Sequence, residues 1–341
     1  MDRKMKALIM KAKGKYRVAE VPVPKPEKGE VLIRVDSCGL CGTDVHIYRG
    51  KFFANLPLII GHEISGTVVE TGQKVTTVKE GDKVVVNPNM NCELCYFCRR
   101  GKVHLCENLV NIGVRINGGF AEFVNVKESY VYRLSNEIDL EEASFVEPLS
   151  CCIHGAEMAQ IKSADQVVIL GAGPVGLLML QIIKLMATSR VVVVDPVKKR
   201  RELAQNLGAD WTVDPIKSDI LDYLPKLLGK LPDIVFECVG KKQTMEQSWK
   251  IVNSGGKVVW FGVADPEESI QINPYQIYRK EITISGSFVN PFTTGKAVSL
   301  LESGKIKVKQ LITHRFNLDQ FSQAIKTYEE SKERIKILIK P

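Results

Sequence analysis

Two patterns of hydrophobic and polar positions divide the chain near residue 150. Up to that point, short apolar segments alternate with polar residues, and glycine and proline residues separate one segment from the next. Alternation with a period of two is typical of strands that bury one face, and glycine and proline end such strands. We therefore expect a β-rich domain without a long helix before about residue 140, with strands at 7–10, 31–37, 65–71, 83–86 and 121–126.

From residue 152 onwards, apolar strands alternate with helices. An apolar strand at 167–170 is followed by a helix at 177–186 and by a second strand at 191–194. Strands separated by helices are typical of a parallel sheet with helices on both faces. Further strands expected at 211–213, 234–237, 257–260 and 282–285 complete a six-stranded doubly wound sheet of the Rossmann type.

This rhythm ends after residue 286. The last segment predicts helices at 292–302 and 318–331 and an apolar strand at 335–339. We expect that strand to rejoin the first domain, which otherwise lacks a closing element. The fold class is therefore α/β, with one domain formed by 1–151 and 287–341 and a Rossmann domain at 152–286.

The composition is that of an ordinary globular protein, with 45% hydrophobic and 25% charged residues. The net charge of +8 arises without a basic tail or an arginine-rich aromatic stripe, so we expect no nucleic-acid partner. The most apolar run, at 167–180, has 14 residues, which is too short to span a membrane. The nine cysteines come without a signal peptide, which favours metal ligation in the cytoplasm over disulfides.

The glycine pattern GxGxxG lies between the strand at 167–170 and the following helix. Gly171 permits a tight turn, Gly173 lets a pyrophosphate approach the backbone, and Gly176 allows the helix to pack closely. Asp195 stands 19 positions after Gly176, at the end of the next strand, where a carboxylate accepts hydrogen bonds from a ribose. It would repel a 2′-phosphate, which favours NAD over NADP. Arg200 could cover the adenine or the ribose, or could lie on a solvated helix face.

Four cysteines form a second pattern, Cys92-x2-Cys95-x2-Cys98-x7-Cys106. Thiolates this close repel one another and oxidise unless a metal ion neutralises them, and tetrahedral zinc suits four cysteines. An iron–sulfur cluster is the alternative, but bacterial ferredoxin runs close with three residues and a proline. We expect a structural zinc that holds a lobe and leaves no position for substrate.

A third group of candidate ligands lies near the N-terminus, at Cys41, His62 and Glu63. A thiolate, an imidazole and a carboxylate suit a tetrahedral zinc site with one open position. The alternative is a buried structural cysteine and a core histidine.

With these motifs in order, the whole sequence resembles the zinc-dependent medium-chain dehydrogenases, and within them the polyol (sorbitol-type) branch. The signature GHExxGxxxxxGxxV stands at 61–75 and CGTDVH at 41–46. The four-cysteine lobe, GGFAEF at 118–123, GAGPVG at 171–176 and THRF at 313–316 follow in family order. The resemblance implies a GroES-like catalytic domain and a Rossmann domain that binds NAD, with two zinc ions per chain, one catalytic and one structural.

The resemblance also assigns roles near the catalytic zinc. Cys41 and His62 are implied as ligands, and Glu63 and Glu147 as carboxylates that exchange in the third position. Asp44 matches the acid that orients the histidine ligand. Cys38 lies outside the matching position, and we expect it to be a buried small residue.

Two proton routes are implied. In one, Thr43 takes the proton of the substrate hydroxyl and passes it through the cofactor ribose to His46. In the other, a water held by Glu147 accepts it. Besides the glycine loop, Asp195 and Arg200, the expected cofactor contacts are Pro174, Val175, Val263, Phe288 and Asn290.

The expected reaction is the reversible, zinc- and NAD-dependent oxidation of a polyol secondary hydroxyl to a ketose. Sorbitol dehydrogenases carry an aromatic residue and an Arg-Tyr pair where this chain has Ile47 and Val289-Asn290, which makes sorbitol itself a less suitable substrate. L-Threonine 3-dehydrogenase and 2,3-butanediol dehydrogenase are the enzyme alternatives. A relative that kept the fold without catalysis is disfavoured because such proteins lose the zinc ligands. The resemblance implies a homo-oligomer, either a dimer or a tetramer.

Overall fold

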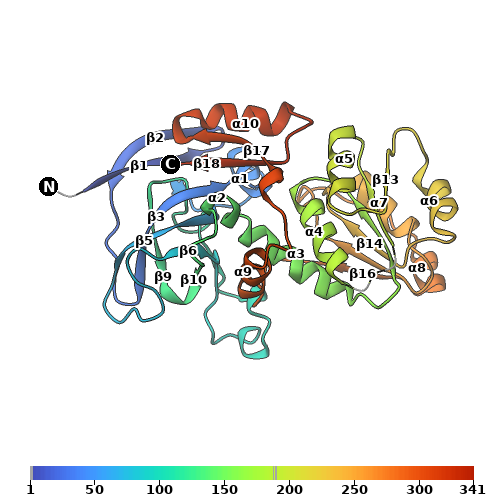
Figure 1. The fold of residues 1–341 in the computed structure, drawn as a ribbon, viewed down its shortest axis with the longest axis horizontal. Coiled ribbons are helices and arrows are strands. Elements are labelled where there is room, and N and C mark those ends of the chain that lie inside the picture. Colours follow the sequence, from blue (N-terminus) through green and yellow to red (C-terminus); the bar gives the residue numbers. More distant parts are fainter. Residues whose placement is uncertain (1–2, 187, 189) are drawn as a thin grey trace. The chain divides into compact units, whose positions relative to one another are not determined.

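The computed structural model describes residues 3–186, 188 and 190–341. The chain divides into two compact units. Figure 1 shows the ribbon coloured by residue number. Unit 1 comprises Met1–Ser150 and Asn290–Pro341, and unit 2 comprises Cys151–Val289. The assignment of 1–151 with 287–341 to catalysis and of 152–286 to cofactor binding stays a prediction.

Unit 1 is built on a seven-stranded, mainly antiparallel sheet. The C-terminal strand β18 pairs with β3 on one side and with β17 on the other, so the last residues of the chain close the first domain as expected. The sheet order is β10 (Val131–Arg133), β6 (Lys83–Val86), β5 (Glu63–Thr71), β3 (Glu30–Gly39), β18 (Lys336–Lys340) and β17 (Ile312–Asn317), with β9 (Phe123–Lys127) also paired to β3.

Two smaller sheets and several helices complete unit 1. The sheets are β2 (Lys15–Pro22) with β1 (Lys4–Ala12) and β4 (Leu58–Ile59), and β7 (Asn89–Met90) with β8 (Val110–Asn111). The helices are α1 (Gly42–Tyr48), η1 (Cys98–Arg100), η2 (Val103–Leu105), η3 (Glu128–Tyr130), α2 (Leu140–Ala143), α9 (Thr294–Glu302), η4 (Lys309–Leu311), η5 (Leu318–Gln320) and α10 (Phe321–Glu330). Helix α3 (Val146–Ala159) begins in unit 1 and continues into unit 2.

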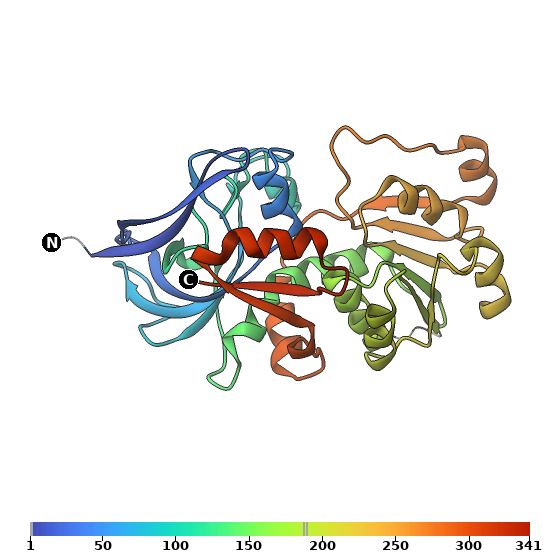
Figure 2. The ribbon, with the colours of Figure 1, turned by 90° about the horizontal axis from the view of Figure 1, so that it is seen from above.

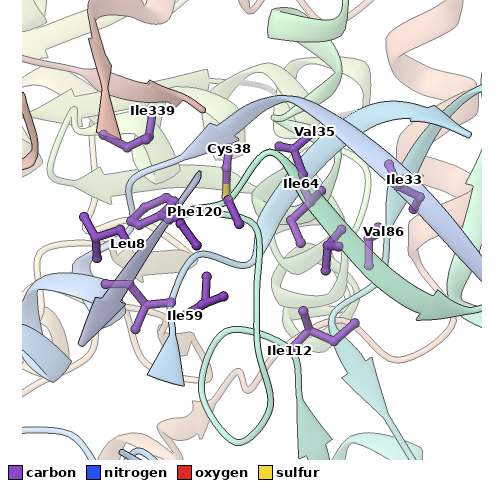
Figure 3. Close-up of a cluster of buried hydrophobic side chains, with 14 of the residues drawn as sticks. Leu8, Ile33, Val35, Cys38, Ile59, Ile64, Val86, Ile112, Phe120 and Ile339 are labelled. Atoms are coloured by element: carbon purple, nitrogen blue, oxygen red, sulfur yellow. The ribbon is translucent and has the colours of Figure 1, made fainter. Parts of the chain in front are cut away.

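The core of unit 1 lies where the inward faces of the strands meet α10. Figure 3 shows side chains from β1, β3, β5 and β18 converging on Phe120. Figure 2 shows α10 lying along the C-terminal strands, which it contacts through its apolar face. Phe321, the first residue of α10, is fully buried and meets the ring of Phe120 at a centroid distance of 6.0 Å.

Unit 2 carries the six-stranded parallel sheet that the alternation of strands and helices predicts. Its order is β13 (Trp211–Val213), β12 (Arg190–Val194), β11 (Gln166–Leu170), β14 (Ile234–Glu237), β15 (Lys257–Trp260) and β16 (Thr283–Gly286). The order reverses between β11 and β14, which is the arrangement of a Rossmann fold. Its helices are α4 (Pro174–Leu185), α5 (Lys198–Asn206), α6 (Ile220–Leu228), α7 (Lys242–Lys250) and α8 (Pro274–Lys280).

One local expectation differs from the structure, and one short helix was not predicted. The segment expected as a helix at 318–331 begins as the 3₁₀ turn η5 and becomes α-helical only at Phe321. The reason is local, because Asn317 and Gln320 each accept a hydrogen bond from the other's backbone N–H and close a tighter turn. The short helix α1 carries no detectable period in seven residues and is not evident from the pattern.

Among the described residues, no helix has both the length and the apolar character needed to cross a membrane.

Replacing Phe321 with alanine should lower the free energy of unfolding by about 3–5 kcal/mol, because a fully buried ring leaves a cavity that its neighbours only partly fill. Besides Phe120, the lost contacts include the rings of Tyr16 at 5.0 Å and Tyr48 at 6.1 Å. Urea unfolding followed by circular dichroism measures the change.

The matched control is Phe53→Ala, since this phenylalanine is 66% exposed. It should cost less than about 1 kcal/mol. All three tryptophans lie between residues 211 and 260, in unit 2, so their fluorescence follows that unit separately. Equal losses for the two variants would show that the Phe321 ring does not support the core.

Candidate metal centres and cofactor loop

Three predicted ligands converge in unit 1. A sulfur of Cys41, a ring nitrogen of His62 and a carboxylate oxygen of Glu63 all lie within 4.8 Å of one another. Cys41 precedes helix α1, His62 is the last residue of the loop between β4 and β5, and Glu63 is the first residue of β5. His62 and Glu63 are both buried, which keeps competing water away from the group. A thiolate, an imidazole and a carboxylate at this spacing fit a zinc ion that keeps one position open.

Asp44 holds the two ligand-bearing segments together from inside. Its carboxylate is completely buried and accepts hydrogen bonds from the backbone N–H of Cys41 at 2.9 Å and of Gly61 at 3.2 Å. Its Oδ1 also lies 3.5 Å from Nδ1 of His62. Burial acts to lower the pKa of His62, but the negative charges of Asp44 and Cys41 outweigh it, and the pKa is raised well above its usual value. With Nδ1 directed at Asp44, Nε2 is the nitrogen left for a metal ion.

Glu63 has a buried cationic partner, Lys336 of β18. Its Oε2 forms an ion pair with the Lys336 ammonium, and the side chains are only 2% and 4% exposed. Burial acts to lower the pKa of Lys336, but Glu63 and Cys41 more than offset it, so the pKa is raised. Gly39 lies against the pair, and a Cβ there would come within 1.8 Å of Oε2 and 2.7 Å of Lys336 Cε. A larger residue at this position of β3 would therefore force the ion pair to shift.

The remaining predicted catalytic residues lie in unit 1. The sulfur of Cys41 is 3.8 Å from Oγ1 of Thr43, and His46 follows one turn later in α1. Glu147 is buried in the first turn of α3 and acts on the pKa of Lys336, although it is outside the group of three ligands. Cys38 is fully buried, as expected, and burial raises the pKa of its thiol.

A hydrogen-bonded amide network leads to the helix that carries Glu147. Asn111 donates to Asn89 at 2.6 Å, and Asn89 donates to Asn290 at 2.6 Å. Asn290 donates to Oγ of Ser150 at 2.7 Å, and Ser150 donates to the carbonyl of Glu147 at 2.6 Å. Asn290, predicted as a cofactor contact, is 2% exposed. Both its amide oxygen and its amide nitrogen take part in this network.

The four cysteines of the lobe form a second compact group. Their sulfur atoms all lie within 4.8 Å of one another, with 3.5 Å between Cys95 and Cys98 and 3.9 Å between Cys95 and Cys106. Sulfurs bound to one zinc at about 2.3 Å are about 3.8 Å apart at the corners of a tetrahedron. An iron–sulfur cluster holds several metal ions and needs its cysteines farther apart. The spacing therefore fits a single ion.

Backbone N–H groups point at these sulfurs and stabilise their thiolate forms. The N–H of Cys92 and of Asn108 both lie 3.3 Å from Cys106 Sγ, and the N–H of Cys95 lies 3.4 Å from Cys92 Sγ. The N–H groups of Leu94 and Cys95 lower the pKa of Cys92 to about 6, whereas burial outweighs the N–H donors at Cys106 and raises its pKa to about 11. Such donors are typical of cysteines that bind a metal as thiolates.

In unit 2, the glycine loop connects β11 to α4 as predicted. Gly171 has a φ of +100°, which favours glycine. A Cβ at Gly176 would come within 1.9 Å of the Gly171 carbonyl oxygen, whereas a Cβ at Gly173 would meet nothing within 4 Å. Gly176 therefore serves packing, and Gly173 leaves open space beside the loop. Helix α4 begins at Pro174, followed by Val175, so its N-terminus faces that loop and favours an anion.

Asp195 supports the loop as well as offering a ribose contact. Its Oδ2 accepts a hydrogen bond from the backbone N–H of Ala172 at 2.8 Å, and its Oδ1 accepts one from Val197 at 2.8 Å. Each carboxylate oxygen accepts two hydrogen bonds, so capacity for a ribose hydroxyl remains. Arg200 approaches Oδ2 to 3.9 Å and is mostly buried, which does not match a solvated helix face.

Two other predicted cofactor contacts, Val263 and Phe288, are 63% and 50% exposed within the described structure of unit 2.

Two polar residues were not predicted from the sequence. Glu237 is fully buried at the end of β14 and accepts hydrogen bonds from the N–H groups of Val239 and Gly240 and the hydroxyl of Thr244. Lys336 is the other. It is the first residue of β18, and the signal for it in the sequence is a lysine within the apolar run 335–339.

Two family models match the chain. The alcohol dehydrogenase GroES-like domain matches residues 27–136, and the zinc-binding dehydrogenase model matches residues 174–303. A solved zinc-binding dehydrogenase from Sinorhizobium meliloti, bound to NADP, superposes with a TM-score of 0.95 at 35% identity, covering 99% of this chain and 100% of that one.

Full-length relatives carry several activities. D-Arabinitol dehydrogenase 1 of Uromyces fabae is 35% identical over 100% of this chain and 98% of its own length. Sorbitol dehydrogenase of Gallus gallus is 33% identical, covering 98% and 96%. L-Threonine 3-dehydrogenase of Pyrococcus abyssi is 36% identical, covering 97% of each. The chain therefore belongs to the zinc-containing medium-chain alcohol dehydrogenases, as a zinc-dependent alcohol or polyol dehydrogenase that uses a nicotinamide cofactor.

Proposed function

We propose that the protein catalyses the reversible oxidation of a secondary hydroxyl of a polyol to a ketose, with NAD as hydride acceptor. The observation that carries the chemistry is the convergence of Cys41, His62 and Glu63 within 4.8 Å. Cys41 and His62 would hold the catalytic zinc, with Glu63 or Glu147 as the exchanging carboxylate. When bound, zinc supplies Lewis acidity toward the substrate hydroxyl, and NAD supplies the hydride acceptor.

Residues of α1 are arranged to remove the proton. Thr43 and His46 are three positions apart and so share one face of the helix. The hydroxyl of Thr43, 3.8 Å from the Cys41 sulfur, would take the proton of the substrate hydroxyl, and His46 would release it to solvent. The second route places a water against Glu147, whose backbone the amide network holds.

The cofactor preference rests on the charge of Asp195. A buried carboxylate beside the glycine loop repels a 2′-phosphate and accepts hydrogen bonds from ribose hydroxyls. Arg200 would lie over the adenine or the ribose, while Val263 and Phe288 offer exposed apolar surface for the nicotinamide end. The Sinorhizobium structure contains NADP, so the preference for NAD needs its own test.

A polyol is favoured by the named relatives that oxidise D-arabinitol or sorbitol. Sorbitol itself is less suitable, because Ile47 is buried and Val289-Asn290 lacks the guanidinium and phenol donors that would bind distal hydroxyls. The threonine dehydrogenase relative supports L-threonine as the second candidate substrate. The third candidate is 2,3-butanediol, supported by the solved 2R,3R-butanediol dehydrogenase of Bacillus subtilis, which superposes with a TM-score of 0.91 at 29% identity.

NADH formation should be measured with D-arabitol, xylitol, galactitol, galactitol 1-phosphate and sorbitol, and with L-threonine and 2,3-butanediol, each before and after chelation. We expect the highest kcat/KM for a polyol other than sorbitol, and loss of turnover on chelation. Turnover of threonine or butanediol alone would retain the mechanism and reject the polyol assignment.

Replacing Cys41 with alanine should remove a zinc ligand and abolish turnover, while NAD binding measured by fluorescence stays within about threefold because the glycine loop is intact. Metal analysis should fall from two zinc ions per chain, one for each ligand group, to one. Iron in place of zinc would reject the assignment of the four-cysteine lobe. Loss of NAD binding together with turnover would place the catalytic site elsewhere.

Replacing Asp195 with asparagine should raise the NADP-to-NAD ratio of kcat/KM about tenfold or more, since the charge is removed while one oxygen can still accept the Ala172 N–H. Asp195→Ala is the comparison, because it also removes that support and should weaken both cofactors. An unchanged ratio in Asp195→Asn would show that the carboxylate does not face the ribose.

A further inference from the structure

We propose that Lys336 is a positioning residue that keeps Glu63 displaceable from the catalytic zinc. The inference rests on the catalytic zinc site described above and concerns how its coordination opens. Lys336 pairs with Oε2 of Glu63 and therefore competes with a metal ion for that carboxylate.

The first argument comes from burial. Lysine is almost never fully buried unless it is paired, and the Lys336 side chain is 4% exposed in the interior of unit 1. It lies in a sheet strand whose other side chains are mostly apolar, beside the ring of Phe145 at 6.0 Å. A methionine or leucine would fill the same space without a desolvation cost. The ammonium is therefore present for its charge.

The second argument comes from the anions that face it. Glu63, Cys41 and Glu147 all act electrostatically on Lys336, and Asp44 faces His62 in the same site. With Cys41 as a thiolate, this site has four negative charges, against two on zinc and one on Lys336. Without Lys336, a second buried carboxylate would have the metal as its strongest partner. Binding of both carboxylates would close the position that substrate needs.

The third argument comes from the backbone. Gly39 of β3 pairs with Glu63 of β5 and with Leu338 of β18, so the ion pair sits over a point where three strands meet. A Cβ at Gly39 would displace Oε2 of Glu63 or Cε of Lys336, so the glycine leaves room for the pair as it stands. The sheet thus holds the carboxylate near the ligand group, and the cation beside it stabilises the carboxylate when it is not bound to the metal.

The test measures zinc release to a chromophoric chelator, which requires no substrate. Cys41→Ala identifies the phase that belongs to the catalytic site, because only that phase should disappear. In Lys336→Met, Glu63 loses its cation and should bind the metal fully, so that phase should slow about tenfold or more. Lys336→Arg keeps the charge and should release zinc within about threefold of the parent rate.

The double variant Lys336→Met/Glu63→Gln removes the freed carboxylate and should restore release to near the parent rate. Cobalt substituted at the catalytic site provides a second readout, because its visible absorption depends on coordination number. The spectrum should change in Lys336→Met and return toward the parent in the double variant. A merely structural lysine would leave the spectrum of the folded variants unchanged.

Glu63→Gln alone keeps the test decisive if Lys336→Met does not fold. Because Glu63 is a weak ligand in the parent, its loss should speed zinc release by less than about tenfold. A larger acceleration, or unchanged or faster release in folded Lys336→Met, would overturn the proposal. Since neither release nor the cobalt spectrum uses substrate, failure to oxidise polyols would reject only the proposed substrate.

Discussion

The buried carboxylate of Asp44 is the group on which the catalytic centre depends. It joins the N–H of Cys41, the N–H of Gly61 and the ring of His62, and these come from two separate segments of the chain. Neither segment alone has enough regular structure to fix a ligand, because α1 has seven residues and the loop before β5 has none. An uncharged group of the same shape would accept these donors more weakly. The acid therefore determines both the positions of the ligands and which nitrogen of His62 is available.

This arrangement leaves unit 1 with a concentration of negative charge in its interior. Buried charges are tolerated only when they are paired or bind a metal ion, and here both solutions operate side by side. Lys336 pairs with the carboxylate of Glu63, and a bound zinc ion would neutralise further negative charge in the site. Zinc binding is therefore coupled to the stability of unit 1 through electrostatics as well as through coordination. The four-cysteine lobe follows the same principle with backbone N–H groups in place of a lysine.

Much of this could be predicted because the signals are local. The sheet of unit 2 follows from alternating strands and helices, and the metal ligands follow from closely spaced cysteines and the GHE motif. The pairing of Lys336 with Glu63 could not be predicted, because it joins residues from opposite ends of the chain through the register of three strands. The contact from Asp195 to Ala172 was missed for a related reason, since a motif specifies which residues occur but not which N–H groups they satisfy. Asn290 likewise became interpretable only when its two partners were seen.

The amide network has a consequence for the chemical lifetime of the protein. Asparagine deamidates when the backbone N–H of the following residue attacks its side chain, and the product is a carboxylate that cannot donate a hydrogen bond. Asn290 is followed by Pro291, which has no backbone N–H, so this route is closed at the residue that donates to Ser150. Asn89 and Asn111 precede the bulky residues Met90 and Ile112, which hinder the same cyclisation. The network that supports the helix carrying Glu147 is thus built from asparagines in sequence contexts that deamidate slowly.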